Sequence, residues 1–282
     1  MRQWRKGVAA WKIGDTLYLS VVFTWDVKKA VAAAKKHKGP VVVGGPAAML
    51  MRDRFDGIAE VRQISEDFEP ILMHNPLASF STRGCPRKCG FCAVPRIEGK
   101  FREIWPFRAA PMMCDNNFLD STRKHRLRVI RKLKRFPLVD FNQGLDARKW
   151  TPLIASDMAN LRLHARFAFD HTKDEIAVVD AIRLCRAKTT KKVSVYVLIG
   201  YKDTPEDALH RLEVVRREKA LPNPMRYQPL DAEKKNCFVP SNWPEAELKK
   251  MMRYYSRLRF VSRIPYKDFD NKATRATLRA KI

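Results

Sequence analysis

Three things are scarce in this sequence: acidic residues, long apolar runs and cysteine. No stretch reaches the roughly 18 apolar residues that span a bilayer, so a transmembrane helix is not expected. The basic start, Met1 to Lys6, is followed by no apolar core of a secretory signal. Six cysteines in 282 residues are too few for a disulfide scaffold, so a tight cluster of them indicates metal binding or catalysis. We therefore expect a protein of the reducing cytoplasm.

The shortage of acidic residues leaves a large excess of positive charge. Fifty-six Lys and Arg stand against 30 Asp and Glu, a formal net charge of +26 at pH 7. Hydrophobic residues still make up 45% of the chain, which indicates a globular rather than a disordered protein. A surface this basic repels itself and favours a polyanionic partner. Nucleic acid is the first interpretation and an anionic membrane surface the second.

Hydrophobic patterning divides the chain into three parts. Residues 1–77 predict a small, truncated Rossmann-like α/β segment, with strands at 16–23 and 40–43 and a helix over 26–38. We interpret its Gly44-Gly45-Pro46 stretch as a plain turn rather than a phosphate site. Residues 78–238 alternate strands and helices, which predicts a parallel sheet with right-handed crossovers. The predicted elements are 111–114, 120–135, 138–141, 151–160, 163–169, 174–187, 193–199, 205–219 and 224–230. Residues 239–282 predict a basic, aromatic-rich helical extension.

One short segment concentrates three thiols. Cys85, Cys89 and Cys92 have C-x3-C-x2-C spacing, and Pro86 and Gly90 keep the stretch out of regular structure, so that the thiolates can surround one centre. Soft ligands of this kind favour zinc, Cu(I) or an iron–sulfur cluster. Structural zinc needs four closed ligands, whereas a four-iron cluster held by three cysteines leaves one iron open for a substrate or cofactor.

This segment resembles the signature of the radical SAM superfamily, including the aromatic Phe91 before the third cysteine. The resemblance covers about residues 78–235 and implies a partial (β/α)6 barrel with its active site at the carboxyl ends of the strands. It implies that Cys85, Cys89 and Cys92 ligate a [4Fe–4S] cluster whose open iron chelates S-adenosylmethionine (SAM). Reductive cleavage of SAM then yields methionine and a 5′-deoxyadenosyl radical. The electron donor implied is a flavodoxin or ferredoxin.

The resemblance also implies a set of SAM-binding residues. Asp115 and Asn117, in a stretch similar to the Asp-Asp-Asn-Phe variant of the family's amino-group motif, offer acceptors for an ammonium, with a loop cap as the alternative. Arg166 resembles the carboxylate-binding position, and the glycine of the fifth-strand motif lets the adenine approach. The full set is Phe91, Asp115, Asn117, Gln143, Arg166, Ile199, Gly200 and Tyr201. Asp146 and Arg148 are further candidates, and for Gln143, Asp146 or Arg148 taken alone surface polarity is an equal explanation. Tyr227 and Gln228 are candidates on the sixth strand.

Two subgroups of the superfamily are similar to parts of this chain. The N-terminal segment is similar to a cobalamin-binding domain, but it is too short and has no Asp-x-His-x-x-Gly motif, so we expect no cobalamin. Residues 92–100 resemble the loop after the cluster in tRNA methylthiotransferases. Those enzymes hold a second cluster with N-terminal cysteines that are missing here, so methylthiolation is disfavoured unless Cys114, Cys185 and Cys237 gather in space.

The distribution of basic residues favours a nucleic-acid substrate. Eight of the 13 residues from 123 to 135 are basic, namely Arg123, Lys124, Arg126, Arg128, Arg131, Lys132, Lys134 and Arg135. The C-terminal segment interleaves basic and aromatic residues, at Arg253, Tyr254, Tyr255, Arg257, Arg259 and Phe260. Such faces suit phosphate neutralisation and stacking on unpaired bases. The sequence therefore predicts a radical SAM enzyme that modifies tRNA or DNA, without a membrane partner. The alternatives are a radical SAM enzyme acting on a peptide or small metabolite, and a non-catalytic zinc protein that binds nucleic acid.

Overall fold

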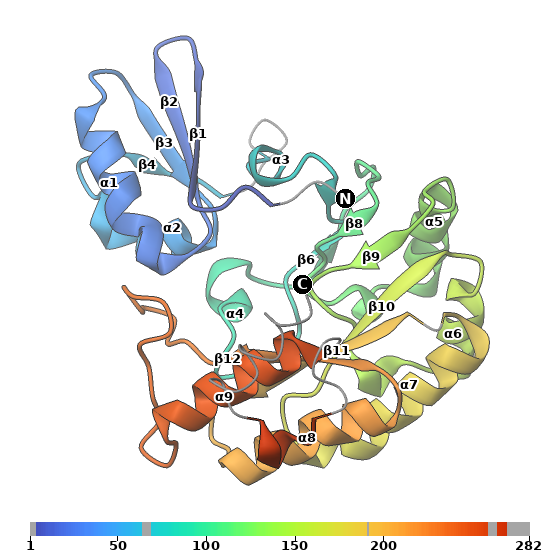
Figure 1. Ribbon diagram of the computed structural model, residues 1–282. Coiled ribbons are helices and arrows are strands. Elements are labelled where there is room, and N and C mark those ends of the chain that lie inside the picture. Colours follow the sequence, from blue (N-terminus) through green and yellow to red (C-terminus); the bar gives the residue numbers. More distant parts are fainter. Residues whose placement is uncertain (1–3, 64–68, 191, 259–263, 270–282) are drawn as a thin grey trace, which may run out of the picture.

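The computed structural model describes residues 4–63, 69–190, 192–258 and 264–269. Within these ranges the chain forms two α/β units, each with its own sheet and apolar core (Figure 1). The mixed α/β class predicted from the sequence is confirmed. No helix in the described ranges is both long and apolar enough to cross a bilayer. The predicted Arg259 and Phe260, and most of the basic chain end, lie outside the described residues.

The N-terminal unit is a four-stranded sheet covered by two helices. Its strands, in spatial order, are β1 (Val8–Ile13), β2 (Thr16–Val21), β3 (Val41–Gly44) and β4 (Glu60–Val61). Strands β2 to β4 are parallel, and β1 pairs antiparallel with β2. The helices are α1 (Val27–Lys36) and α2 (Pro46–Leu50), with 3-10 turns at Thr24–Asp26 and Arg52–Phe55. The predicted strand–helix–strand unit is confirmed, whereas β1 was missed because its Ala and Lys residues favour a helix as much as a strand.

The turn at the end of β3 requires glycine for a steric reason. Gly45 has a φ of +94°, and a Cβ at this position would lie 2.6 Å from the carbonyl oxygen of Val21. Pro46 then begins α2, a position where its missing N–H is harmless. The Gly-Gly-Pro stretch therefore serves the close packing of β3 against β2.

The larger unit is built on a six-stranded parallel sheet. Its strands are β5 (Ala78–Ser79), β8 (Met112–Met113), β9 (Val139–Phe141), β10 (Leu163–Ala168), β11 (Val193–Ile199) and β12 (Leu221–Arg226). Its main helices are α5 (Arg123–Leu133), α6 (Pro152–Met158), α7 (Glu175–Lys188), α8 (Pro205–Arg217) and α9 (Glu245–Ser256). Shorter elements are α3 (Ile71–His74), α4 (Val94–Ile97), the paired strands β6 (Thr82–Arg83) and β7 (Arg102–Glu103), and 3-10 turns at Phe118–Asp120, Ala147–Lys149, Thr172–Asp174 and Tyr266–Asp268.

The strands of this sheet follow one another in space as they do in the chain. The order is β5-β8-β9-β10-β11-β12 and every pairing is parallel. Each strand thus crosses over to its immediate neighbour, which brings all the carboxyl ends to one rim. Among the described residues, β5 and β12 remain the two edges, so the sheet is open between them.

The helices cover one face of this sheet and form the main core with it. Alternate side chains such as Val139, Phe167 and Val195 point into the helix layer and are fully buried. The residues between them face the inner side of the curved sheet. The predicted strand at 224–230 begins three residues earlier in the structure, because Pro222 and Pro224 are tolerated in β12 at the sheet edge.

The aromatic residues of α9 do not form the stacking face predicted from the sequence. Tyr254 and Tyr255 are 0% and 2% exposed, and they pack in the main core. The Tyr254 hydroxyl donates to the Ile264 carbonyl, and the Tyr255 hydroxyl donates to Glu213. The prediction failed because the amphipathic period of α9 turns its aromatic residues inward, toward α8 and β12. Within the described part of the predicted extension, α9 therefore packs in the core through its aromatic and apolar side chains.

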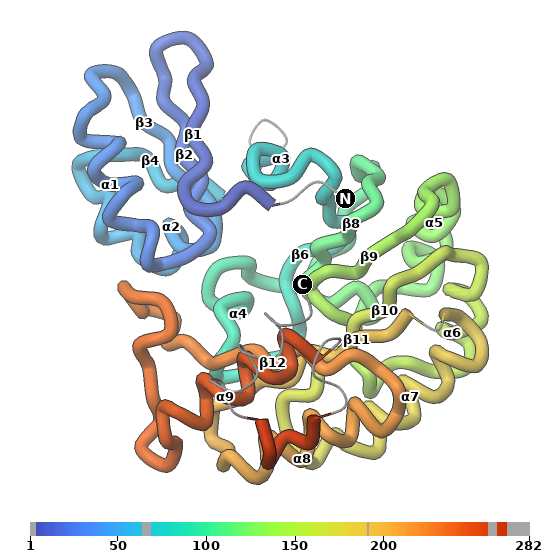
Figure 2. Tube along the Cα trace, viewed as in Figure 1, coloured from blue at the N-terminus to red at the C-terminus, as the bar shows by residue number. Residues whose placement is uncertain are grey.

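The two units contact one another at several places. The chain path brings the N-terminal unit beside α4 and the loop after β12 (Figure 2). In that loop, Glu233 pairs with Lys28 at 2.6 Å and with Arg54 at 2.9 Å. On another side, His74 of α3 is buried and its Nε2 lies 3.0 Å from the Ser20 hydroxyl of β2. These contacts join the small unit to the loop after β12 and to α3.

Candidate functional site

The three clustered cysteines lie in the loop between β6 and α4, after the carboxyl end of the first strand of the large sheet. Cys85, Cys89 and Cys92 are all partly exposed. Gly84 begins the loop with a φ of +75°, and a Cβ there would lie 2.6 Å from the Lys100 carbonyl oxygen. The Cys92 N–H donates to the Cys89 carbonyl at 3.0 Å, so these two residues share one turn.

Cys85 and Cys89 are close enough to Cys92 to influence its ionisation. Burial, together with the charges of Cys89 and Cys85, raises the pKa of the Cys92 thiol. Thiolates that repel one another are stabilised by a metal bound among them. In the described part of the chain, no three His, Cys, Asp or Glu side chains, these thiols included, meet as ligands of a single ion. The loop brings three soft ligands into one neighbourhood without closing around one ion.

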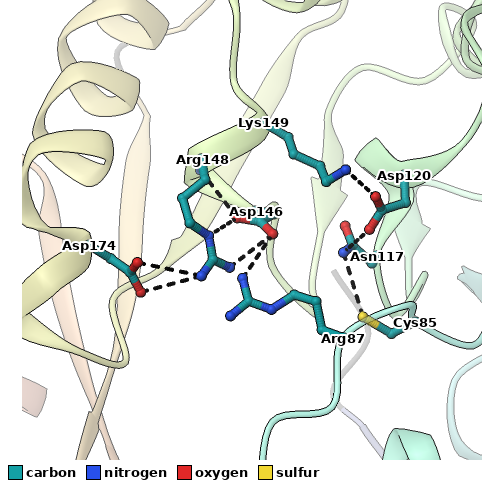
Figure 3. A network of polar contacts seen from close by, with 8 residues as sticks. All are labelled: Cys85, Arg87, Asn117, Asp120, Asp146, Arg148, Lys149 and Asp174. Atoms are coloured by element: carbon teal, nitrogen blue, oxygen red, sulfur yellow. Dashed lines mark hydrogen bonds and ion pairs between the residues drawn. The ribbon is translucent and has the colours of Figure 1, made fainter.

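A chain of ion pairs connects the cysteine loop to the loop after β9 (Figure 3). Arg87, inside the cysteine loop, donates to Asp146 at 3.2 Å, and Asp146 also accepts from Arg148 at 2.7 and 2.9 Å. Arg148 in turn reaches Asp174 at 3.4 Å. Burial raises the pKa of Asp146 although Arg87 lowers it. Asp146 and Arg148, both candidates from the sequence, therefore hold the cysteine loop through Arg87.

A second contact reaches the loop from the segment after β8. The Asn117 Nδ2 lies 3.6 Å from the Cys85 sulfur and also donates to Asp120, which pairs with Lys149 (Figure 3). The Asn117 Oδ1 is buried and has no hydrogen-bond partner among the described residues. A buried acceptor without a donor is unfavourable, so this oxygen is suited to a donor supplied by a ligand. The structure thus brings Asn117, a candidate from the sequence, to the cysteine loop.

Asp115 has a mainly structural environment. Its Oδ1 accepts hydrogen bonds from the backbone and hydroxyl groups of both Ser81 and Thr82. Burial raises its pKa in spite of these bonds. Its Oδ2 has no partner among the described residues. Asp115 therefore fixes the segment that leads into the cysteine loop, which was the alternative reading of this residue, and only Oδ2 is left for a ligand.

The predicted carboxylate-binding residue Arg166 already has a carboxylate partner. Its Nε and Nη2 donate to the two carboxylate oxygens of Asp140 at 2.6 and 2.7 Å. Asp140 is 1% exposed and lies 3.5 Å from His164 Nδ1. Burial alone would raise the pKa of Asp140, but Arg166 and His164 lower it to about 2. The edge of the guanidinium formed by Nε and Nη2 is thus occupied within the sheet.

Aromatic residues line the rim on the other side of the cysteine loop. Phe91 contacts Tyr201 edge to face at 5.3 Å between ring centres, and Tyr201 lies 4.7 Å from Tyr227. A Cβ at Gly90 would come within 2.6 Å of the Tyr201 hydroxyl, so glycine permits this close approach. The structure brings together Phe91, Tyr201 and Tyr227 from the loop and from the ends of β11 and β12.

The remaining predicted residues contribute less through their side chains. Ile199 is fully buried between the sheet and the helices, so only its backbone is available at the rim, where its carbonyl accepts from the Tyr227 N–H at 2.9 Å. Gly200 follows with a φ of +80° and forms the turn after β11. Gln143 is exposed, and no contact brings it to the cysteine loop among the described residues. Gln228 bonds to Asn236 in the loop after β12.

One residue of the rim was missed from the sequence. Asp170 lies two residues after the end of β10, and burial raises its pKa to about 6, against the opposing charges of Arg211 and Arg87. Its charge also acts on Cys92. The signal was present, because a polar residue shortly after an apolar strand is the same rule that selected the candidates after β9.

The other cysteines do not form a second centre in the described ranges. Cys114 and Cys185 are buried, Cys237 is exposed, and burial raises the pKa of Cys114 and of Cys185 to about 12. Cys114 and Cys185 are therefore packed in the protein interior, whereas Cys237 lies at the surface.

No known protein family matches this chain, and no curated protein is significantly similar to it. The chemistry of the site therefore follows from its own residues. Thiols, a buried amide oxygen, carboxylates and aromatic rings meet after the carboxyl ends of the strands of one parallel sheet. Such a rim can hold a soft metal centre beside an organic cation with a planar ring.

Proposed function

We propose that this protein is a radical SAM enzyme. The observation that supports this most is the position of the cysteine loop. Cys85, Cys89 and Cys92 follow the first strand of a six-stranded parallel sheet, and Asn117, which contacts Cys85, has a buried Oδ1 without a hydrogen-bond partner among the described residues. The donor set fits a cluster with three thiolate ligands, and the orphan oxygen fits a cationic ligand beside it.

The sheet topology is compatible with the proposed barrel. Six parallel strands in sequential order, with helices on the outer face, are what a partial (β/α)6 barrel requires. A doubly wound sheet would instead reverse its strand order at a switch point. Among the described residues, the sheet stays open between β5 and β12.

Each residue of the rim has a role in this proposal. Cys85, Cys89 and Cys92 hold the [4Fe–4S] cluster, whose bound form supplies one electron to SAM and so generates a 5′-deoxyadenosyl radical. The Oδ1 of Asn117 and the Oδ2 of Asp115 accept hydrogen bonds from the methionine ammonium, since both oxygens are buried and have no partner among the described residues. Phe91 and Tyr201 provide aromatic surface for the adenine.

The substrate in this proposal is a nucleic acid, either tRNA or DNA. The net charge of +26 and the eight basic residues from 123 to 135 support it. The electron donor is a flavodoxin or ferredoxin. A peptide or metabolite substrate remains the alternative for the enzyme, and a zinc-loop protein is the alternative outside catalysis.

The test is anaerobic reconstitution with iron and sulfide, followed by dithionite and SAM, with 5′-deoxyadenosine measured by chromatography. We expect a brown protein that forms this product, and loss of both colour and product in Cys89→Ala. Cys237→Ala is the matched control, because it removes an exposed thiol outside the loop and should change neither. A colourless, zinc-containing protein that forms no 5′-deoxyadenosine would overturn the proposal.

A further inference from the structure

An exposed tryptophan packs against side chains of the basic helix α5. Trp105 follows β7 by two residues and is 39% exposed. The Arg128 guanidinium carbon lies 3.8 Å from the Trp105 ring centre, and the Lys132 Nζ lies 4.6 Å from it. We call Trp105, Arg128 and Lys132 the Trp105 platform. It combines open aromatic surface with two cations four residues apart on one helix.

The bases of α5 have almost no acidic partners. The helix itself has no Asp or Glu. Eight Lys and Arg side chains lie between residues 123 and 135, six of them in α5, and among the described residues their only ion pair is that of Arg123 with Asp157. The exposed bases without such a pair are Lys124, Arg131, Lys134 and Arg135. Like charges at helical spacing repel one another, so this arrangement destabilises the free protein. A polyanion removes the repulsion.

The structure distinguishes between the polyanions that α5 could meet. Its apolar side chains Val129, Ile130 and Leu133 are at most 2% exposed and pack in the main core. An interfacial membrane helix needs a free apolar face, which α5 does not have. A cation–π contact with Trp105 needs only one cation. It does not explain why several further Lys and Arg side chains near the ring have no acidic partner. Phosphates together with planar rings match both features.

We propose that the Trp105 platform binds an unpaired segment of nucleic acid, with one base stacked on Trp105 and the adjacent phosphates on Arg128 and Lys132. This deepens the proposed function and rests on its nucleic-acid substrate. It also replaces the stacking face expected on α9, where Tyr254 and Tyr255 are buried.

The platform is connected to the candidate site through short contacts. The Ile104 N–H, next to Trp105, donates to the Ser81 carbonyl at 2.8 Å, four residues before Cys85. Glu103 accepts from the Thr122 N–H at the start of α5. From that start to Arg128 is about 8 Å along the helix. A strand that stacks on Trp105 can therefore continue over the rim toward the cysteine loop.

The experiment measures binding of a fluorescein-labelled oligouridylate, an oligothymidylate and a DNA duplex to the full chain over a range of salt concentrations. For Trp105→Ala we expect affinity for both single strands to fall about tenfold, the loss typical of one stacked base, with duplex affinity little changed. For Arg128→Ala/Lys132→Ala the slope of log affinity against log salt should fall by about 1.4, or about 0.7 for each lost phosphate contact.

The matched control is Lys36→Ala/Lys38→Ala, which removes the same charge from exposed positions of the N-terminal unit and should leave the salt slope unchanged. Trp105→Phe keeps an aromatic ring and should retain most of the affinity, which separates stacking from a folding defect. SAM cleavage without substrate should be unchanged in all four variants.

The outcomes separate this inference from the proposed function. If the wild-type chain binds single strands but the platform variants match the control, the platform is wrong and the nucleic-acid substrate stands. If duplex binds as tightly as single strands and Trp105→Ala changes nothing, stacking on the platform is overturned. If no nucleic acid binds, both the platform and the proposed substrate are wrong. If the wild-type protein binds nucleic acid but does not cleave SAM, only the radical SAM proposal is overturned.

Discussion

Replacing Asp140 by asparagine tests whether Arg166 is held by the sheet or available to a cofactor. Asp140 and Arg166 lie on neighbouring strands, β9 and β10, and form two hydrogen bonds. The Asp140 side chain is 1% exposed and that of Arg166 is 19% exposed. Asp140→Asn keeps the size of the side chain but leaves the Arg166 charge without its counter-ion. If Arg166 is instead available to bind the SAM carboxylate, Asp140→Asn should change the free energy of unfolding little.

The expected loss of stability can be worked out in two ways. Breaking a buried ion pair by removing one partner destabilises a protein by about 3–5 kcal/mol, and the partial exposure of Arg166 points to the lower end, about 3 kcal/mol. Independently, the pKa of Asp140 falls from its usual 3.8 to about 2. That difference corresponds to about 2 kcal/mol of stability at neutral pH. The two figures agree within the precision of either.

The pH dependence gives this prediction its sign. Because the folded pKa of Asp140 is depressed, its contribution is fully present above the unfolded pKa of about 4 and is lost as the pH falls toward about 2. The difference in unfolding free energy between the wild type and Asp140→Asn should therefore be constant near neutrality and shrink below about pH 4. His164 also faces Asp140. His164→Gln should therefore lower the free energy of unfolding too, but by less than Asp140→Asn does.

The assay is urea denaturation at successive pH values, with Asp157→Asn as the matched control. Asp157 forms a similar two-bonded pair with Arg123, but the Arg123 side chain is 53% exposed. Because the Arg123 side chain is solvated, removing this pair should destabilise the protein clearly less than Asp140→Asn does. Equal, small losses for Asp140→Asn and Asp157→Asn would refute the reasoning. An Arg166→Met/Asp140→Asn double variant should be less destabilised than the sum of its single variants.

Three further predictions concern the rim and the core. Asn117→Ala should raise the KM for SAM about tenfold, since a hydrogen bond to a charged group is lost, and an unchanged KM would leave Asn117 only its contacts within the chain. Iodoacetamide near neutral pH should label Cys237 but not Cys114 or Cys185, whose pKa of about 12 keeps them as thiols, and mass spectrometry of the native protein would reveal any contrary labelling. Arg211→Met should lower the free energy of unfolding by about 3 kcal/mol, because it strands the Asp203 carboxylate and two carbonyls, and a loss below about 1 kcal/mol would contradict the buried pair.

The outcome for particular residues shows how far local patterning reaches. The strand over 193–199 was predicted with its observed limits, because seven mostly β-branched and apolar residues leave no competing structure. Asn117 and Phe91 were selected by motif, and they do lie against the cysteine loop or its aromatic neighbour. The stacking role of Tyr254 and Tyr255 failed, because composition does not reveal which side of a helix a core will cover.

What the sequence determined by itself was the alternation of strands and helices, the cysteine loop and the excess of positive charge. These depend on residues near one another in the chain, through hydrophobic period, turn chemistry and composition. Only the tertiary structure decided that Arg166 is paired with Asp140, that Arg87 is held by Asp146, and that Trp105 lies on α5. Each of these pairs is separated by 20 residues or more, and the partner of a charge or ring is chosen by which strand ends and helix faces the packing brings together.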